Sequence, residues 1–265
     1  MVETIPRERL EAIPSLFSLA DRVAIVTGGS RGLGRGIALA LAAAGAHVIP
    51  VSRTQRDLEV VADEIRSLGR RSFPIVAEVT DEAQVQHMVQ CAVDEFGRID
   101  ILVNAAGIVI LKPTIEFPVD EWERVIRVNL EGTFLCCREV AKVMLRQEQG
   151  KIINLSSVRG LQGRAKDPAY AASKGAVNLL TKSLAIEWAQ KGITVNAIAP
   201  TFIRTDLNAF LLDDPVTRDW VLSRIPMGRV GQIWDLFGIA IFLASPASDF
   251  ITGQTIYVDG GWTAA

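Results

Sequence analysis

The stretch VAIVTGGSRGLGRGIALALAAAGAHVIPV, residues 23–51, decides the fold of this chain. Val23–Val26 is an apolar, β-branched run, which ends in a glycine-rich turn and is followed by a helical pattern as far as Ala44. Gly45 stops that helix, and the run His47–Val51 predicts a second strand. Strand, turn, helix and strand in this order predict a βαβ unit with parallel strands and a right-handed crossover.

The same alternation continues to the end of the chain. Residue patterns predict helices at 58–68, 81–96, 120–148, 169–190 and 233–244, and strands at 71–76, 100–103, 151–155, 193–199 and 255–258. This alternation predicts an α/β fold of the Rossmann type, a single doubly wound parallel sheet with helices on both faces. No linker or internal repeat interrupts residues 21–265, so we expect one domain there. Residues 1–20, with Pro6 and Pro14, are expected to form a loosely attached N-terminal arm.

Composition narrows the class of protein. With 265 residues, of which 49% are hydrophobic and 22% charged, the chain is long and apolar enough to bury a sizeable core. A net charge of −2 and a pI near 5.8 argue against nucleic acid or an anionic membrane as partner. The chain has three cysteines, and so few and odd a number is typical of a reduced compartment. The first twenty residues lack the continuous apolar core that a signal peptide needs. We therefore expect a soluble cytoplasmic protein with no membrane partner.

A tyrosine and a lysine lie one helical turn apart after the strand predicted at 151–155. The spacing of four puts Tyr170 and Lys174 on one face of a helix, and Ser157 lies thirteen residues before the tyrosine, at a strand end. A nearby cation favours phenolate, so Lys174 is expected to lower the pKa of Tyr170 and to suit it for proton transfer. Taken alone, such a pair is better explained by a half-buried aromatic residue and a solvated charge, and it is the nearby Ser157 that favours a functional pair here.

The glycine turn is a candidate phosphate-binding loop. Its pattern, T-G-x-x-x-G-x-G, places Gly28, Gly32 and Gly34 between a strand and a helix, where backbone N–H groups face an anion; a purely structural turn is the competing interpretation. The second strand ends at Ser52 and Arg53 with no acidic residue from 47 to 56. Because an arginine there suits a ribose 2′-phosphate, NADP(H) is favoured, with NAD(H) as the alternative.

Several motifs occur together in a fixed order. They are Thr27–Gly34, Asn104-Ala-Ala-Gly, Asn129, Ser157 and Tyr170-x-x-x-Lys174, and with them the chain resembles the short-chain dehydrogenases/reductases from Leu19 to Trp262. The resemblance implies a catalytic tetrad of Asn129, Ser157, Tyr170 and Lys174. It implies that tyrosine exchanges the proton, serine hydrogen-bonds the substrate oxygen, lysine binds the ribose, and asparagine holds a water.

The resemblance also implies a set of cofactor-binding residues. They are Gly28, Ser30, Arg31, Gly32, Leu33, Gly34, Ser52, Arg53, Glu78, Val79, Asn104, Ala105, Ala106, Gly107, Tyr170, Lys174, Pro200, Ile203 and Thr205. Three positions depart from the family pattern. Ala105 replaces a frequent asparagine, Glu78 replaces an aspartate near the adenine, and Thr201 replaces the glycine of Pro-Gly.

The expected function is an NADP(H)-dependent interconversion of a secondary alcohol and a ketone. The chain most resembles the gluconate 5-dehydrogenase branch, which acts on sugar acids and polyols, with a substrate lid at about 205–228. Arg159 is either a contact for a substrate carboxylate or a surface charge. The resemblance also implies a homotetramer, with a homodimer as the alternative.

Two other functions stay open, and two are excluded. The first open alternative is a 3-oxoacyl-acyl-carrier-protein reductase, and the second is a catalytically silent dinucleotide-binding regulator. A serine hydrolase needs a histidine beside Ser157, whereas His47 and His87 belong to the adenine half of the sheet. The sequence has no cluster of residues at metal-ligand spacing, so no metal site is expected.

Overall fold

The computed structural model describes residues 6–205 and 209–264. Their core is a seven-stranded parallel sheet in the order β3-β2-β1-β4-β5-β6-β7. The order reverses direction between β1 and β4, as in a doubly wound sheet, so the carboxyl ends of these two strands border a crevice. The strands are β1 (Val23–Thr27), β2 (His47–Ser52), β3 (Ile75–Val76), β4 (Ile101–Asn104), β5 (Gly150–Leu155), β6 (Ile193–Pro200) and β7 (Thr255–Val258).

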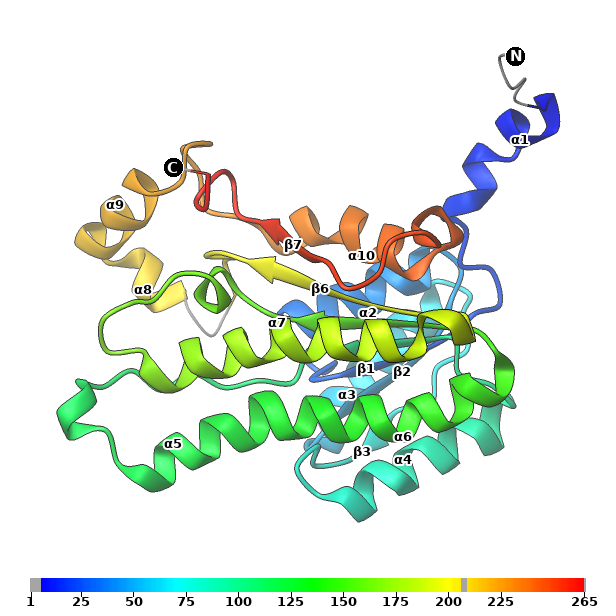
Figure 1. Ribbon diagram of the computed structural model, residues 1–265, viewed down its shortest axis with the longest axis horizontal. Helices are drawn as coiled ribbons and strands as arrows, with labels where there is room; N and C mark the ends of the chain where they lie inside the picture. The colour runs from blue at the N-terminus through cyan, green and yellow to red at the C-terminus, as the bar shows by residue number, and fades with distance from the viewer. Residues whose placement is uncertain (1–5, 206–208, 265) are drawn as a thin grey trace.

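Helices cover both faces of the sheet (Figure 1). One face carries α4, α6 and α7, and the other carries α2, α3 and α10, each against its own buried apolar cluster. The α-helices are α1 (Arg7–Glu11), α2 (Gly32–Ala43), α3 (Gln55–Ser67), α4 (Glu82–Phe96), α5 (Val119–Ile126), α6 (Gly132–Gln147), α7 (Pro168–Trp188), α8 (Ala209–Asp213), α9 (Pro215–Ser223) and α10 (Phe237–Ala244). The predicted fold class is confirmed. Within the described residues, no helix is both long and apolar enough to span a bilayer.

Three elements differ from the sequence expectation. The third strand shrinks from 71–76 to two paired residues and one bridge at Ser72, because Pro74 has no N–H to donate at this edge of the sheet. The helix expected over 120–148 contains a wide π-turn, Arg127–Glu131, between α5 and α6. The helix expected over 233–244 begins as a 3₁₀ turn, Ile233–Leu236, and becomes α10.

The N-terminal arm projects from the body of the molecule (Figure 1). It consists of α1 and a 3₁₀ turn, Ile13–Phe17, with no buried residue in either element. Phe17 approaches Phe242 with ring centroids 6.3 Å apart, and Leu19 is fully buried. The arm is therefore joined to the body through its last residues.

The segment expected as a substrate lid follows β6. It contains α8 and α9, and residues 206–208 of it lie outside the described part of the chain. Trp220 of α9 packs edge-on against Phe202 and Trp262, with ring centroids 6.3 and 5.8 Å away. Aromatic contacts thus join this segment to the chain's last turn, beside the carboxyl end of the sheet.

Candidate active site

The glycine turn packs directly against the turn that follows β4. A Cβ on Gly28, whose φ is +64°, would lie 2.8 Å from the Ala106 nitrogen, and a Cβ on Gly34 would lie 2.2 Å from the Gly28 oxygen. Only glycine fits such close backbone approaches. The Thr27 hydroxyl accepts hydrogen bonds from the N–H groups of Ala105 and Ala106, at 3.2 and 3.3 Å. Thr27 therefore ties the two turns together, a role that the sequence motif contained but that the residue predictions missed.

A first cavity, here called the glycine-turn cavity, opens between the carboxyl ends of β1 and β2, and has a volume of about 240 Å³. Among the predicted cofactor residues it is lined by Gly28, Ser30, Arg31, Ser52, Arg53, Glu78, Val79, Ala105, Ala106 and Gly107. Arg53 Nη1 lies 3.4 Å from Glu78 Oε2, so this arginine has a carboxylate partner. Asp57 and Arg124 also line the cavity, although the sequence predictions omitted them. Asp57 lies only four residues after Arg53, so its place near this cavity could have been predicted from the sequence.

A second cavity, here called the tyrosine cavity, adjoins the first. The two share Arg31, Ala105, Gly107 and Ile108, so together they form one elongated space. The tyrosine cavity has a volume of about 490 Å³, and the predicted residues that line it are Arg31, Gly32, Leu33, Ala105, Gly107, Tyr170, Lys174, Ile203 and Thr205. Leu155, Ser156 and Thr201 complete one wall.

Five predicted residues do not line these two cavities, and one of them is Ser157, whose neighbour Ser156 does. Gly34 packs on the Gly28 backbone, and Pro200 ends β6 in register with Val258. The Asn104 side chain donates to Asn154 Oδ1 at 2.9 Å and to Cys137 Sγ at 3.2 Å, inside the core between β4 and β5. Asn129 lies behind Gly107, where a Cβ would come within 3.3 Å of Asn129 Oδ1. Gly34 and Asn104 therefore shape the site from behind.

The tyrosine, serine and lysine meet where β5 ends and α7 begins. Ser157 acts on the hydroxyl of Tyr170, and Lys174 Nζ lies 5.5 Å from the centroid of the tyrosine ring. Lys174 Nζ donates to the carbonyl oxygen of Leu155 at 2.6 Å. The i, i+4 spacing on α7 thus brings both side chains to the end of the strand that carries the serine.

Burial governs the proton affinities at this point. It raises the pKa of Tyr170 to about 12, even though the Ser157 side chain and the charge of Arg159 act in the opposite direction. Burial also lowers the pKa of Lys174 to about 8. The expectation that Lys174 lowers the pKa of Tyr170 is therefore wrong for this structure. The reason is that desolvation penalises the phenolate more than the neighbouring positive groups stabilise it.

Asn129 sits in the π-turn between α5 and α6. Its Oδ1 accepts from the Ile108 nitrogen at 2.8 Å, and its Nδ2 donates to the Ile108 oxygen at 2.9 Å and to Ser173 Oγ at 3.0 Å. Thr133 Oγ1 donates to the backbone carbonyl oxygen of Asn129 at 2.8 Å and so gives this oxygen of the wide turn a hydrogen-bond partner. A π-turn at a functional site is a recurrent arrangement, and here it fixes Asn129 between the β4 turn and α7.

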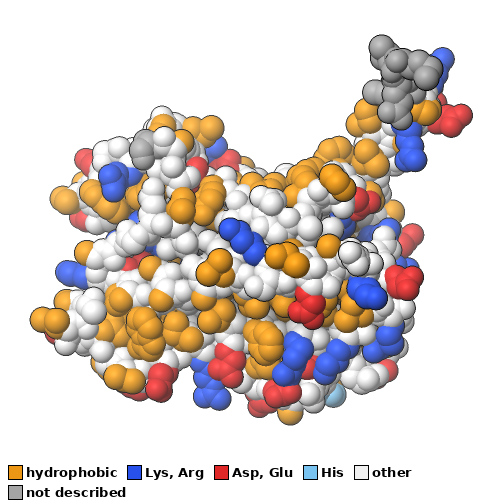
Figure 2. Space-filling view, viewed as in Figure 1, with side chains coloured by type: hydrophobic (Ala, Val, Ile, Leu, Met, Phe, Trp, Pro, Cys, Tyr) orange, Lys and Arg blue, Asp and Glu red, His pale blue; other side chains and the backbone are white. Residues whose placement is uncertain are grey.

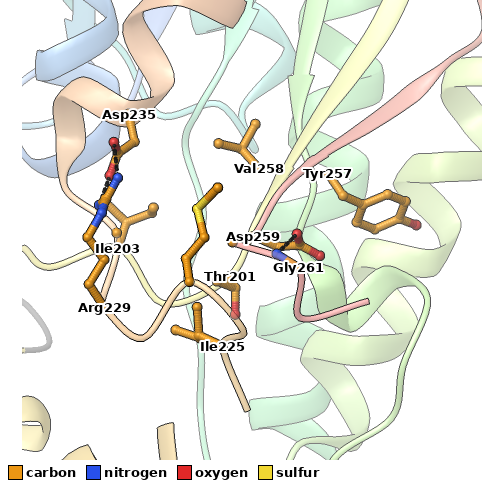
Figure 3. A pocket seen from close by; sticks show the side chains of 12 residues that line it. Thr201, Ile203, Ile225, Arg229, Asp235, Tyr257, Val258, Asp259 and Gly261 are labelled. Atoms are coloured by element: carbon orange, nitrogen blue, oxygen red, sulfur yellow. Dashed lines mark hydrogen bonds and ion pairs between the residues drawn. The ribbon is translucent and has the colours of Figure 1, made fainter. Parts of the chain in front are cut away.

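A third cavity lies beyond the tyrosine cavity, and shares Thr201 and Ile203 with it (Figure 3). Its volume is about 380 Å³, and its wall combines Ile225 and Met227 with the carboxyl end of β7. Arg229 and Asp235 form an ion pair of 2.6 Å at its edge. This cavity separates the β6 end from the segment that follows α9.

Known proteins with similar sequences and structures point to one family. The family model described as enoyl-(acyl carrier protein) reductase matches residues 28–263. The chain is 43% identical over 247 residues to a 2-dehydro-3-deoxy-D-gluconate 5-dehydrogenase from Pseudoalteromonas atlantica, covering 93% of this chain and 97% of that protein. It is 44% identical over 239 residues to a 3-oxoacyl-(acyl-carrier-protein) reductase from Staphylococcus aureus, covering 90% of this chain and 96% of that protein.

A crystal structure of similar fold carries two small molecules. It is a gluconate 5-dehydrogenase from Burkholderia cenocepacia in complex with NADP and tartrate. The TM-score is 0.91 and the identity 43%, over 94% of this chain and 98% of that one. Matches of this extent and identity cover the glycine turn, the tyrosine and the lysine together. The chain therefore belongs to the short-chain dehydrogenase/reductase family.

Proposed function

We propose that this protein is an NADP(H)-dependent oxidoreductase that interconverts a secondary alcohol and a ketone on a sugar acid. The observation that carries the proposal is that Tyr170 and Lys174 line a cavity that continues into the glycine turn, while Ser157 acts on the Tyr170 hydroxyl from beside it. A proton-exchanging phenol and a dinucleotide-sized groove are thus joined in one space. Relatives named as sugar-acid dehydrogenases support the reaction class.

The residues present fit a dinucleotide. The glycine turn leads into the start of α2 and lines both cavities with Gly28, Arg31 and Gly32, and the N-terminus of a helix is a favourable place for a phosphate. When bound, the nicotinamide ring supplies hydride exchange at the substrate carbon. Gly32 and Leu33 would hold the pyrophosphate, Lys174 the ribose, and Ile203 and Thr205 the carboxamide.

The phosphorylated cofactor is favoured by charge. Arg31 and Arg53 both line the glycine-turn cavity, beside the Ser52 hydroxyl. Glu78 and Asp57 partly offset this positive charge. NADP is the cofactor named with the Burkholderia cenocepacia enzyme, which supports NADP(H) here and leaves NAD(H) as the alternative.

Each member of the tetrad then has a role that its contacts support. With a pKa raised to about 12, Tyr170 holds its proton at neutral pH and gives it to the substrate oxygen during reduction. Ser157, which acts on the Tyr170 hydroxyl, orients the same oxygen. Lys174 lines the cavity and donates a hydrogen bond to the Leu155 carbonyl oxygen. Asn129 fixes the turn after β4 by accepting a hydrogen bond from the Ile108 nitrogen.

The experiment is a rate comparison at fixed protein concentration. NADP⁺ reduction is followed with D-gluconate, and NADPH oxidation is followed with a 3-oxoacyl thioester as the rival substrate. We expect turnover with the sugar acid. Turnover confined to the thioester would favour the acyl-carrier-protein reductase alternative, and binding of NADPH without turnover of either would favour the silent regulator.

We also propose a cytoplasmic homotetramer, with a homodimer as the alternative, and a substrate lid at 205–228. Hydrophobic side chains gather over α5, α6 and α7 on the face shown in Figure 2. The exposed hydrophobic residues of these helices include Leu179 and Ile186 of α7, at 65% and 82%, and Phe134 of α6, at 39%. An apolar helical face of this kind favours association with a second copy. Light scattering of the purified protein tests this, and a monomer at micromolar concentration would contradict it.

A further inference from the structure

Arg159 is a buried arginine close to the reacting groups. It lies two residues after Ser157 in the 3₁₀ turn Val158–Gly160, and only 8% of it is exposed. Its guanidinium carbon lies 5.3 Å from the Trp262 ring. Nη1 donates to the Gly163 oxygen at a long 3.5 Å, and Nη2 is buried without any partner in the described chain. A guanidinium stays charged in proteins, so a buried one with an unused donor lacks its usual counter-ion.

Two further arginines gather at the same place. Arg164 lies about 6 Å from the rings of Phe202 and Trp220, and Arg224 lies 5.7 Å from the Trp262 ring. Burial and the charges of Arg164 and Arg224 lower the pKa of Arg159. Within the described residues, no carboxylate lies within 4.0 Å of any of these three guanidinium groups. The three arginines form a cationic cluster held by aromatic rings.

One acidic group faces the cluster. Asp167, the residue before α7, is 2% exposed, and its Oδ1 has no hydrogen-bond partner among the described residues. Burial raises the pKa of Asp167 to about 6, although Arg164 and Arg159 act against that rise. At most one negative charge therefore offsets three positive ones. The cluster has a net positive charge that favours an anion.

The cluster is adjacent to the reacting groups. The Arg159 backbone N–H donates to Ser157 Oγ at 3.1 Å, and the Arg159 charge also acts on the Tyr170 hydroxyl. Trp220 and Arg224 come from α9 and the residue after it, and Trp262 from the last turn of the chain. A substrate whose oxygen meets Tyr170 and Ser157 thus has positive charge and aromatic surface beside it.

We propose that Arg159, assisted by Arg164 and Arg224, binds the carboxylate of the substrate and so selects sugar acids over neutral polyols. This rests on the proposed function and deepens it. An arginine fork matches a carboxylate with two parallel hydrogen bonds, and Nη2 is the donor that lacks a partner. The Trp262 ring packs beside the guanidinium. Arg159 is thus a specificity-determining residue, and acts on the acid group while Tyr170 acts on the alcohol.

The test compares two substrates with the same carbon skeleton, D-gluconate and D-glucitol, with NADP⁺. In Arg159→Met the kcat/KM for gluconate should fall at least tenfold through KM, about 1.4 kcal/mol, while that for glucitol changes less than threefold. Arg159→Lys, which keeps the charge but loses the fork, should recover part of this preference. The matched control is Arg218→Met, since Arg218 is an exposed arginine of α9 beside Asp219. It should change neither value.

Binding of tartrate by calorimetry, with NADP⁺ present, gives a readout independent of turnover and should weaken in parallel. Arg224→Met removes an exposed arginine, so it serves as the second variant if Arg159→Met does not fold; it should lower the gluconate preference at least threefold. If the wild type prefers gluconate and Arg159→Lys and Arg224→Met both keep that preference and the tartrate affinity, this inference is overturned while the proposed function stands. A wild type that oxidises glucitol as well as gluconate would overturn this inference alone, whereas a wild type that does not oxidise gluconate would overturn the proposed function.

Discussion

The ammonium of Lys174 donates a 2.6 Å hydrogen bond to the carbonyl oxygen of Leu155, which joins the catalytic helix to the end of the strand that carries Ser157. Lys174 is 5% exposed, and burial lowers its pKa to about 8. The native state therefore holds a charge that the surrounding protein solvates less well than water does. The buried charge of Lys174, which activity requires, therefore lowers the stability of the fold.

Lys174→Met should remove turnover and raise stability at pH 7. In the native protein the lysine releases its proton at a lower pH than in the unfolded chain, so wild-type stability rises with pH between about 8 and 10.5. The advantage of the methionine variant, about 1–3 kcal/mol at pH 7, should therefore shrink towards pH 10. Urea unfolding at several pH values measures it. Lys182→Met, on an exposed position of the same helix, is the control, and an advantage that does not depend on pH would contradict the prediction.

Tyr170→Phe should fold and bind NADPH normally while turnover falls by about 10²–10⁴-fold, the usual contribution of a positioned acid. The ring remains in place, and only the hydroxyl that meets Ser157 is lost. Steady-state rates and NADPH fluorescence on the same preparation separate the two effects. Activity within a few-fold of the wild type would remove Tyr170 from its proposed role.

Arg53→Asp should abolish a preference for NADPH over NADH. We expect the wild type to bind NADPH at least tenfold more tightly, about 1.4 kcal/mol. The new carboxylate would stand beside Glu78, 3.4 Å from the present guanidinium, and would repel a 2′-phosphate. Fluorescence titration with both cofactors measures this. Arg56→Asp introduces the same charge at an exposed position that does not line the cavity, and equal behaviour of the two variants would show that Arg53 is a loop charge.

Gly34→Ala should destabilise the protein by about 3 kcal/mol, at the upper end of overpacking effects, and should weaken NADPH binding. The added Cβ would lie 2.2 Å from the Gly28 oxygen, so the phosphate-binding turn would have to shift. Gly238→Ala is the matched control, since nothing lies within 4 Å of a Cβ on that helical glycine. Thermal unfolding should show a lower Tm for the first variant only; an unchanged Tm would mean that the turn adapts.

The sequence by itself determined the parallel sheet, because buried β-branched runs alternate with helical patterns and glycines stop each unit. It also determined that Tyr170 and Lys174 share a helix face, since that relation depends only on a spacing of four. Those inferences needed local information alone. Strand three was the exception, where Pro74 at the sheet edge shortened the pairing to two residues.

The tertiary structure alone decided the electrostatics. The pKa of Tyr170 rises because the surrounding chain removes water from its hydroxyl, a cost that a motif does not contain. Arg53 pairs with Glu78, and Arg159 packs on Trp262, across 25 and 103 positions of sequence respectively. From the sequence alone, Arg159 could be a ligand for a carboxylate, but a surface charge was the favoured interpretation. Its burial depends on the fold that brings Trp262 against the turn after β5, because solvation is set by every neighbour in space and not by neighbours along the chain.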